Sequence, residues 1–341
     1  MKVDRDSYLA YVRLFTDKEK ALIREFQEWL PESIIDSHAH CNLPEHVWSI
    51  DERAYSHMLS TFPSFSLEES KEWHALFYPG KKICSLRFPK TFRGINHRAA
   101  NLYLLSQSDP QDRVALYGLP DDSEYTIEML KHPRVSALKM YYSYLEPPAT
   151  EIYQYFPKVV LEVAQVLDIP IILHPPKNIM VCLDQILKLV YDFPCLRLCL
   201  AHLSLTKNVF PGLEEAFIML SRYPHIHFDT ALVPSAQVVA MALRIVGPDR
   251  IMYGSDEPLN LIRSMPYIHP ELGERLVTEY PYHWVNLNEH NKYKHLAVGV
   301  THAHWQVLSA IRGAIGELPS SEQECVKRKI FHDNAYDFFG F

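Results

Sequence analysis

Two histidines stand one residue apart in the stretch IIDSHAHCN, directly after a short apolar run. In a β-strand, residues i and i+2 point to the same face, so His38 and His40 are expected to lie side by side. By the same alternation Asp36 falls on their face, one layer deeper, where it would orient its neighbours. Neutral imidazole is a common ligand of Zn²⁺ and similar ions, and two on one face supply half of a metal site. The rest of the chain must provide the other half.

Side chains that can bind a metal or a proton also end most of the later apolar runs. They are Lys139, His174, His202, Asp229 and Asp256. Successive members are separated by about one helix plus one strand, which is the length of a β/α repeat. The carboxyl ends of parallel barrel strands converge on one mouth, so these residues are expected to meet there and complete the site. Asp229 is the exception, because a buried, hydrogen-bonded carboxylate is its more plausible role.

Eight short apolar runs carry the strand signal, and helical spacing separates most of them. The runs cover residues 33–36, 82–88, 113–119, 135–141, 169–174, 196–202, 225–230 and 250–256. Strands alternating with helices imply right-handed crossovers and a parallel sheet, and eight repeats are what a closed (β/α)8 TIM-like barrel requires. An open doubly wound sheet is the alternative fold, but no G-x-G-x-x-G follows the first run.

The whole chain, residues 1–341, is predicted to form a single metal-dependent α/β barrel domain with additions. Residues 1–32 form an N-terminal helical extension. Residues 41–80 and 257–300 interrupt the repeat after the first and eighth strands, and the first of these stretches is rich in aromatic residues. In a barrel both emerge on the face that carries active sites, so we expect the two insertions to form a cap.

Composition narrows the choice of partner. The net charge of the 341-residue chain is -7 and its pI is about 6.2, with no block of Lys or Arg, which argues against nucleic acid and favours a small-molecule substrate. No run approaches the length of a membrane span, and the N-terminus lacks the apolar core of a signal peptide. Six dispersed cysteines without a CxxC fit the cytoplasm. The sequence is compatible with a homodimer formed through the N-terminal helical segment.

The residue types at the predicted mouth suit a catalytic metal. Three imidazoles and one carboxylate suit one or two divalent ions, most simply Zn²⁺, and a coordination position left to water makes such a site catalytic. Metal coordination can bring the pKa of that water to about 7. Asp256 could share in binding and take the proton of the water. His202 could polarise a substrate carbonyl, stabilise the developing oxyanion or ligate a second ion.

Three further residues are candidates for the substrate or for a bridge between ions. Lys139 would bridge two metals if it were carboxylated, and as a free amine it would bind a substrate carboxylate or take no part. Arg87 ends the second run and could clamp a carboxylate through two hydrogen bonds, with a structural ion pair as the alternative. Tyr141 ends the fourth run and is the other candidate substrate contact. His302 and His304 repeat the His-x-His spelling, but they precede a helical stretch and are expected to begin a helix near the pocket.

The motifs taken in order resemble one family. HAH, IPIILHPP, LCLAHLS, RIMYGSDEP and the closing KIFHDNAYDFFGF together resemble the amidohydrolase superfamily, in particular its amidohydrolase-2 branch, from residue 33 to the C-terminus. The resemblance implies a distorted (β/α)8 barrel in which His202 is a catalytic or second-metal residue. It also implies four metal ligands, His38, His40, His174 and Asp256.

Members of this branch hydrolyse amides, esters and lactones or decarboxylate unsaturated and aromatic acids without an oxidant. Lys139 matches the strand-four lysine that some two-metal members carboxylate and that decarboxylases commonly lack. The resemblance therefore favours a metal-dependent hydrolase, with a decarboxylase as the alternative. A non-catalytic binding module with a structural metal is a third hypothesis, and protein atoms at every coordination position would support it.

Overall fold

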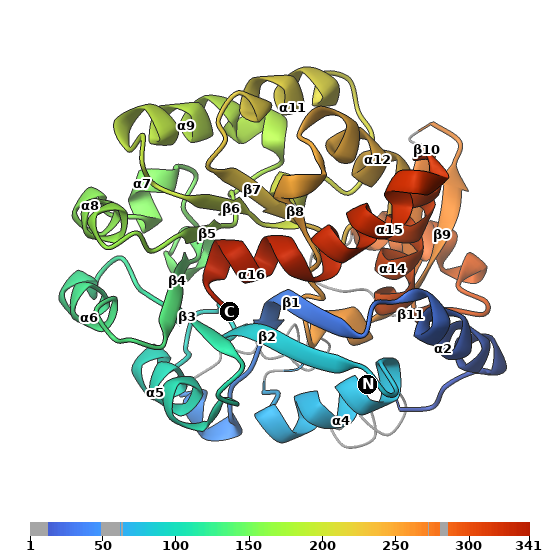
Figure 1. Cartoon of the computed structure of the whole chain (residues 1–341), viewed down its shortest axis with the longest axis horizontal. Helices are drawn as coiled ribbons and strands as arrows, with labels where there is room; N and C mark the ends of the chain where they lie inside the picture. The colour runs from blue at the N-terminus through green and yellow to red at the C-terminus, as the bar shows by residue number, and fades with distance from the viewer. Residues whose placement is uncertain (1–12, 49–61, 63, 272, 280–285) are drawn as a thin grey trace.

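A computed structural model describes residues 13–48, 62, 64–271, 273–279 and 286–341. Its main sheet contains eight parallel strands that neighbour one another in chain order (Figure 1). They are β1 (Ser33–His40), β2 (Lys82–Phe88), β3 (Arg113–Tyr117), β4 (Val135–Met140), β5 (Ile171–Leu173), β6 (Leu198–Leu200), β7 (Ile226–Asp229) and β8 (Ile251–Met252). The predicted (β/α)8 barrel is confirmed, and each strand falls on its predicted run.

A helix follows each strand and packs outside the barrel. These helices are α4 (Leu67–Phe77), α5 (His97–Gln107), α6 (Ser123–Met129), α8 (Lys158–Val166), α9 (Ile179–Asp192), α11 (Leu213–Ser221), α12 (Ala236–Ile245) and α14 (Ala303–Gly316). The first of them lies within the predicted insertion 41–80, because the connection from β1 to β2 needs a crossover helix as any parallel pair does. His302 directly precedes α14 and His304 lies in its first turn, so the second His-x-His does stand at a helix start, as predicted.

The ring closes through the segment that follows β8. Backbone hydrogen bonds run from Asp256 N to His38 O at 2.9 Å and from His40 N to Glu257 O at 2.7 Å. The closure of the barrel and the pairing of the HAH stretch with Asp256 therefore depend on the same hydrogen bonds.

Alternation along the strands separates an inner core from an outer one. The inner cluster takes its strand residues from positions with the same orientation, namely Ile35, Leu86, Phe88, Ala115, Ala137, Ile172, Cys199 and Met252. Lys139 and His174 follow two of these positions by two residues, which places them one layer nearer the carboxyl ends. In β1 the pairing register shifts between Asp36 and Ala39. Ile35 belongs to the inner cluster, so its neighbour Asp36 faces the other way, and the irregularity after Asp36 returns His38 to the inner side. The prediction that Asp36 shares the face of His38 by simple alternation is therefore wrong.

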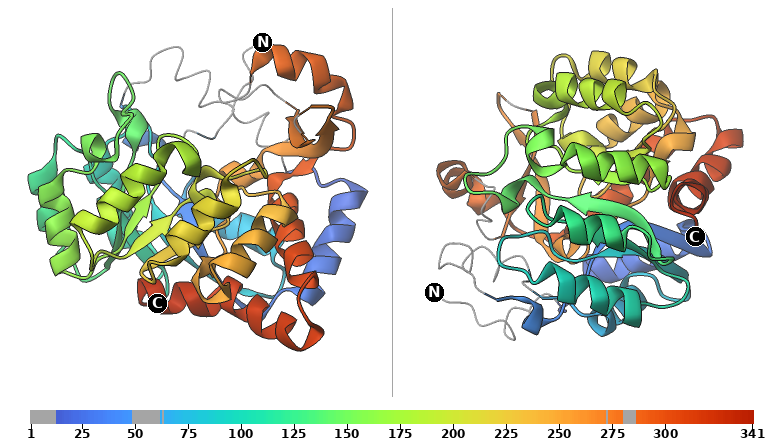
Figure 2. Two further views of the ribbon diagram at one scale, coloured as in Figure 1. Left: turned by 90° about the horizontal axis from the view of Figure 1, so that it is seen from above. Right: turned by 90° about the vertical axis from the view of Figure 1, so that its left-hand side faces the viewer.

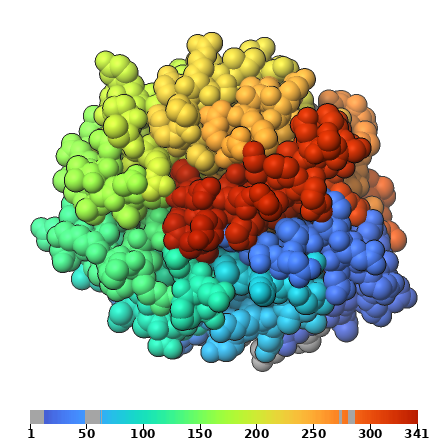
Figure 3. All heavy atoms as spheres, in the orientation of Figure 1, coloured from blue at the N-terminus to red at the C-terminus, as the bar shows by residue number. Residues whose placement is uncertain are grey.

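The C-terminal helix α16 (Asn334–Phe339) covers the amino end of the barrel, where it crosses the molecule in Figures 1 and 3. Phe338 and Phe339 complete the inner apolar cluster from below. Arg197, which precedes β6, donates through Nη1 to Phe338 O at 2.6 Å, and Arg113 at the start of β3 donates to Gly340 O at 2.7 Å. The helix thus covers this end of the barrel, and the mouth formed by the carboxyl ends of the strands lies at the other end.

The segment after β8 forms a second, three-stranded sheet from β9 (Arg263–His269), β10 (Gly273–Thr278) and β11 (Thr301–His302). The helix α13 (Leu287–Tyr293) lies between β10 and β11 in the chain. Figure 2 shows the β9–β10 hairpin at the opposite end of the barrel from α16. No helix in the described parts of the chain is both long enough and apolar enough to cross a membrane.

The predicted N-terminal helical segment appears as α2 (Asp17–Trp29), while residues 1–12 lie outside the described part. A buried ion pair joins α2 to the rest of the molecule. Glu19 Oε1 lies 2.5 Å from His302 Nδ1, and both side chains are fully buried. The partnership with His302 lowers the pKa of Glu19 to about 2, although burial opposes this shift. The extension is therefore held by a charged contact at the start of α14.

We expect Phe338→Ala to lower the free energy of unfolding by about 3 kcal/mol, because it removes a buried ring from the floor of the barrel and leaves a cavity. Urea denaturation followed by far-ultraviolet circular dichroism measures this change. Tyr336→Ala is the matched control on the same helix, since its side chain is half exposed, and it should shift stability by about 0.5 kcal/mol or less. Equal losses in the two variants would contradict the assigned role of α16.

Candidate metal centre

Three of the predicted ligands form one buried cluster at the mouth. One ligand atom each from His38, His40 and Asp256 lies within 4.8 Å of the other two. His38 Nε2 is 3.4 Å from Asp256 Oδ1, and His40 Nε2 is 3.2 Å from the same oxygen. The end of β1 supplies both imidazoles, and the turn after β8 supplies the carboxylate. The structure therefore brings together residues that are more than 200 positions apart in the sequence.

Hydrogen bonds fix which nitrogen of each imidazole is available. His38 Nδ1 lies 2.9 Å from Asp229 Oδ2, and His40 Nδ1 lies 3.0 Å from Pro89 O. Both partners only accept, so each Nδ1 carries the hydrogen and each Nε2 presents a lone pair. Burial lowers the pKa of both histidines, which favours their neutral forms. The Nε2 lone pairs of both histidines therefore face a carboxylate oxygen, and no hydrogen lies between these atoms to relieve their repulsion. A cation bound between them would relieve it.

Asp229 organises the cluster from β7. Besides the bond from His38, its Oδ1 accepts from His202 N at 2.8 Å and from Ala231 N at 3.1 Å. These bonds and the nearby His38 imidazole lower the pKa of Asp229 to about 2, in spite of complete burial. The predicted buried, hydrogen-bonded carboxylate agrees with this geometry. What the sequence did not show is that Asp229 orients His38 and the backbone at His202 together.

His202 begins a strained turn directly after β6. Residues 202–205 all have φ between 47° and 60°, and Asp256 has φ of 60°. Left-handed backbone costs on the order of 1 kcal/mol for each such non-glycine residue and persists where surrounding contacts enforce it, which is common at functional sites. His202 Nδ1 lies 2.7 Å from Ala231 O, so its Nε2 also presents a lone pair. Burial lowers the pKa of His202 to about 4.

His174 lies beside this group. Its Nδ1 is 3.0 Å from Pro175 O, and its ring centre is 5.0 Å from that of His202, which is in turn 4.9 Å from that of His38. Its ligand atoms do not belong to the tight group of three. Tyr141 packs edge-on against His174 with ring centres 4.7 Å apart. The predicted substrate contact therefore borders the mouth.

Lys139 stands inside the barrel without a hydrogen-bond partner. Its side chain is buried, and Nζ lies 5.0 Å from the centre of the Phe88 ring. Burial lowers the pKa of this amine to about 8, while Asp229 and Asp256 act in the opposite direction. An orphaned buried amine beside three ligand-type side chains leaves room for a bound anion or for carboxylation, as the sequence suggested.

Lys90, which follows the end of β2 by two residues, was not among the predicted site residues. Its side chain is buried, and burial lowers its pKa to about 8 while the charge of Asp256 opposes the shift. Pro89, which precedes it, accepts the bond from His40. Extending the search for charged residues from strand ends to the loops behind them would have found Lys90.

Arg87 points away from the mouth. Its neighbours Leu86 and Phe88 occupy the inner cluster, so alternation directs the guanidinium to the outer wall. There Nε lies 3.1 Å from Asp112 Oδ2, and Nη1 lies 3.2 Å from Glu257 Oε2. These contacts are those of a structural ion pair, the alternative considered above, and they do not favour the predicted role as a substrate clamp.

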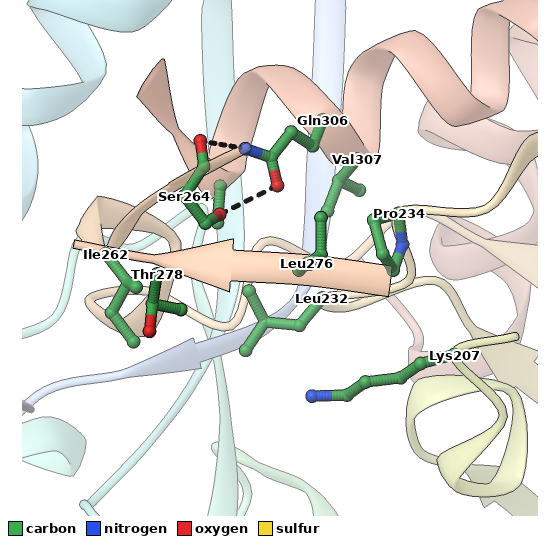
Figure 4. A pocket seen from close by; sticks show the side chains of 10 residues that line it. Lys207, Leu232, Pro234, Ile262, Ser264, Leu276, Thr278, Gln306 and Val307 are labelled. Carbon is green, nitrogen blue, oxygen red and sulfur yellow. Dashed lines mark hydrogen bonds between the residues drawn. The ribbon is translucent and has the colours of Figure 1, made fainter. Parts of the chain in front are cut away.

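A pocket lies between the three-stranded sheet and the loops after β6 and β7 (Figure 4). It is lined by Lys207, Leu232, Pro234, Ile262, Ser264, Leu276, Thr278, Ala303, Gln306 and Val307. Gln306 closes one side through hydrogen bonds to Ser264, whose Oγ donates to Oε1 at 2.8 Å. Burial lowers the pKa of Lys207 while Asp256 opposes the shift, so the pocket is within electrostatic reach of the ligand cluster.

The family model described as amidohydrolase (Amidohydro_2) matches residues 35–341. No curated protein matches the chain.

Several solved structures share the fold at low sequence identity. An amidohydrolase 2 from Bifidobacterium longum subsp. infantis is 13% identical, with a TM-score of 0.55 over 91% of this chain and 100% of that one. A dihydroxybenzoic acid decarboxylase from Polaromonas sp., with bound manganese and an inhibitor, is 14% identical, with a TM-score of 0.54 over 91% and 97%. A probable 2-pyrone-4,6-dicarboxylic acid hydrolase from Acinetobacter baumannii is 13% identical, with a TM-score of 0.55 over 90% and 99%.

Gly254→Ala should weaken metal binding at least tenfold. A Cβ at this position would lie 2.9 Å from the Cβ of His38 and 3.2 Å from that of Ala231, so His38 must shift. Isothermal titration of the metal-free protein with Zn²⁺ measures the change. Gly316→Ala, where an added Cβ meets nothing within 4 Å, is the control and should bind as the wild type does. Unchanged affinity in Gly254→Ala would show that His38 tolerates displacement or is not a ligand.

Proposed function

Because the chain belongs to the amidohydrolase family, whose model covers residues 35–341, we propose that it is a metal-dependent hydrolase acting on the carbonyl of a small-molecule amide, ester or lactone. The observation that carries this proposal is the set of lone pairs at the mouth. His38 and His40 donate their Nδ1 hydrogens to Asp229 and Pro89, and their Nε2 atoms point toward Asp256 Oδ1. A divalent ion fits this donor set, whereas a purely structural role for three groups that only accept does not.

His38, His40 and Asp256 would hold the ion, and His174 would join them. Three imidazoles and one carboxylate suit Zn²⁺, whereas the Polaromonas relative was solved with bound manganese. Zn²⁺ is our proposal. A second ion is part of it only if Lys139 is carboxylated, in which case Lys139 would bridge the two ions and His202 would serve the second.

A bound divalent ion would supply a water activated for attack at neutral pH and a Lewis acid for the carbonyl. The chain's own part is to hold and move protons around that water. Asp256, in contact with both imidazoles of the HAH stretch, is placed to accept the proton that the water loses and to pass it to the leaving group. His202 presents a lone pair, so it can ligate or accept a proton, and it can donate to a developing oxyanion only after it has been protonated.

The second candidate is a non-oxidative decarboxylase of an unsaturated or aromatic acid on the same scaffold. The specific observation in its favour is the unpartnered buried amine of Lys139, which could bind the carboxylate of an acid. The predicted contribution of Arg87 to this reaction is not supported by its contacts, because two carboxylates already occupy the guanidinium. The decarboxylase relative adds a precedent at the level of the fold.

We propose a small-molecule substrate, one small non-reacting group of which enters the pocket of Figure 4, a cavity of about 50 Å³ with one amine among mainly apolar walls. A cytoplasmic location belongs to the same proposal. It is supported by six cysteines that are all free thiols. Neither nucleic acid nor a membrane is an expected partner, and a homodimer stays a prediction.

Asp256→Asn should lower kcat by about a hundredfold or more, because the amide keeps the shape but cannot accept the proton. Steady-state kinetics on the Zn²⁺-loaded enzyme, with metal content measured alongside, tests this expectation. Asp249→Asn is the control, since Asp249 is an exposed partner of Lys329. Full activity in Asp256→Asn would remove the proposed role in proton transfer.

A product assay separates the two reactions. The Zn²⁺-loaded enzyme is incubated with a panel of lactones, esters, amides and aromatic acids, and both CO₂ release and hydrolytic acid are measured. We expect hydrolysis and no CO₂, and we expect chelation to abolish the activity. CO₂ release without hydrolysis would overturn the hydrolase proposal in favour of the decarboxylase, and activity that survives chelation would overturn both.

A further inference from the structure

A buried polar cluster lies outside the barrel wall, between β2 and α4. Glu257 Oε2 accepts from Ser70 Oγ at 2.7 Å and lies 3.2 Å from Arg87 Nη1 and 3.4 Å from His74 Nε2. Arg87 also contacts Asp112 through Nε at 3.1 Å. Glu257 and Arg87 are 2% and 3% exposed, so these charges are shielded from water. The mechanism above uses none of these side chains.

The backbone of Glu257 is part of the ligand cluster. Glu257 directly follows Asp256 in the chain, and its carbonyl oxygen accepts from His40 N at 2.7 Å. Its own N–H donates to Ser255 Oγ at 2.9 Å, and Ser255 is in turn bonded to Asp36. A displacement of Glu257 would therefore move two of the three clustered ligands, one from each side of the barrel closure.

We propose that Arg87 is a positioning residue for the metal centre: by holding the Glu257 carboxylate against the outer wall, it fixes Asp256 and His40 at the spacing that a divalent ion requires. This inference rests on the proposed function, because it presumes that an ion binds at the cluster. It assigns Arg87 to the opposite side of the wall from the substrate.

The charges explain why the guanidinium is needed. Arg87 lies between two buried carboxylates, and removing it would leave both without a counter-charge in a medium of low polarity, which favours their displacement. The contacts diverge, since Nε meets Asp112 and Nη1 meets Glu257. A planar guanidinium serves both directions at once, whereas a lysine ammonium is a single point of charge. Ser70 and His74 come from α4, so this helix contributes to the metal centre from outside the barrel.

The test measures metal affinity separately from activity. Metal-free wild type, Arg87→Met, Arg87→Lys and Glu257→Gln are titrated with Co²⁺, and its visible absorption reports both affinity and ligand geometry. We expect at least tenfold weaker binding and an altered spectrum in Arg87→Met and Glu257→Gln, in line with the effect of removing supports behind metal ligands. Arg87→Lys should recover part of the affinity, because lysine retains the positive charge but cannot contact Asp112 and Glu257 at the same time as the guanidinium does.

Glu19→Gln is the matched control, because it removes another buried ion pair, that with His302, away from the ligand cluster. It should lower the melting temperature while the Kd for Co²⁺ stays within twofold of the wild type. An equal loss of affinity in Glu19→Gln would overturn the inference, since general destabilisation would then explain the result. If Arg87→Met does not fold, Arg87→Lys and Glu257→Gln provide the readout.

Two further outcomes separate this inference from the proposed function. Wild type that binds Co²⁺, together with unchanged affinity and spectrum in every folded variant of Arg87 and Glu257, would overturn the positioning role alone. Wild type that binds no divalent ion would overturn the proposed function and this inference with it.

Discussion

Neutral imidazoles whose Nδ1 hydrogens are all donated to oxygen acceptors set the main constraint at the mouth of this barrel. His38, His40, His174 and His202 each make such a bond, and the acceptors come from β7 and from the loops after β2, β5 and β7. Every acceptor is a carbonyl or a carboxylate, which fixes the tautomers. For His174 the acceptor is the adjacent Pro175, and for the other three it lies far away in the chain. The lone pairs that remain are what make a cation the natural occupant.

The contacts that close the barrel are the same contacts that bring the ligand residues together. The hydrogen bonds that join β1 to the segment after β8 also set the distance between the HAH stretch and Asp256. Gly254 allows this close approach, since no larger residue fits against the Cβ of His38. The positive φ angles of Asp256 and His202 are held by the same surroundings. Strain here is tolerated because the rigid sheet on one side and Asp229 on the other enforce the conformation.

Much of the fold followed from the sequence, because eight apolar runs separated by helical spacing allow few topologies. The HAH stretch and Asp256 were predictable for the same reason, since residues at the ends of parallel strands must converge. The position of Arg87 was not. Whether the last polar residue of a strand points inward depends on the parity of alternation, and the sequence KICSLRF fits either choice until the partner strands are known.

Two other features were beyond sequence reasoning because they arise from contacts across the barrel. The bulge in β1 breaks the alternation that the sequence implies between Asp36 and His38, and Asp36 instead accepts a hydrogen bond from Ser255 N in the turn after β8. The left-handed turn at His202 contains no glycine that would have predicted it from the sequence. The turn is held by a hydrogen bond from His202 N–H to the Asp229 carboxylate. Lys90 was missed because it lies in a loop behind a strand end.

The charge of Lys139 bears on the two reactions proposed for this centre. With Asp229 and Asp256 ionised, a divalent ion makes the mouth close to neutral, and the amines of Lys90 and Lys139 then add positive charge within reach of Asp256. A free Lys139 amine thus favours one ion and an anionic substrate, as a decarboxylase needs. Carboxylation would change that side chain from a cation to an anion, which favours a second ion and a neutral carbonyl substrate. The same buried, unpartnered nitrogen is compatible with both states, so the chemical form of this one residue affects which substrate charge and how many ions the mouth accommodates.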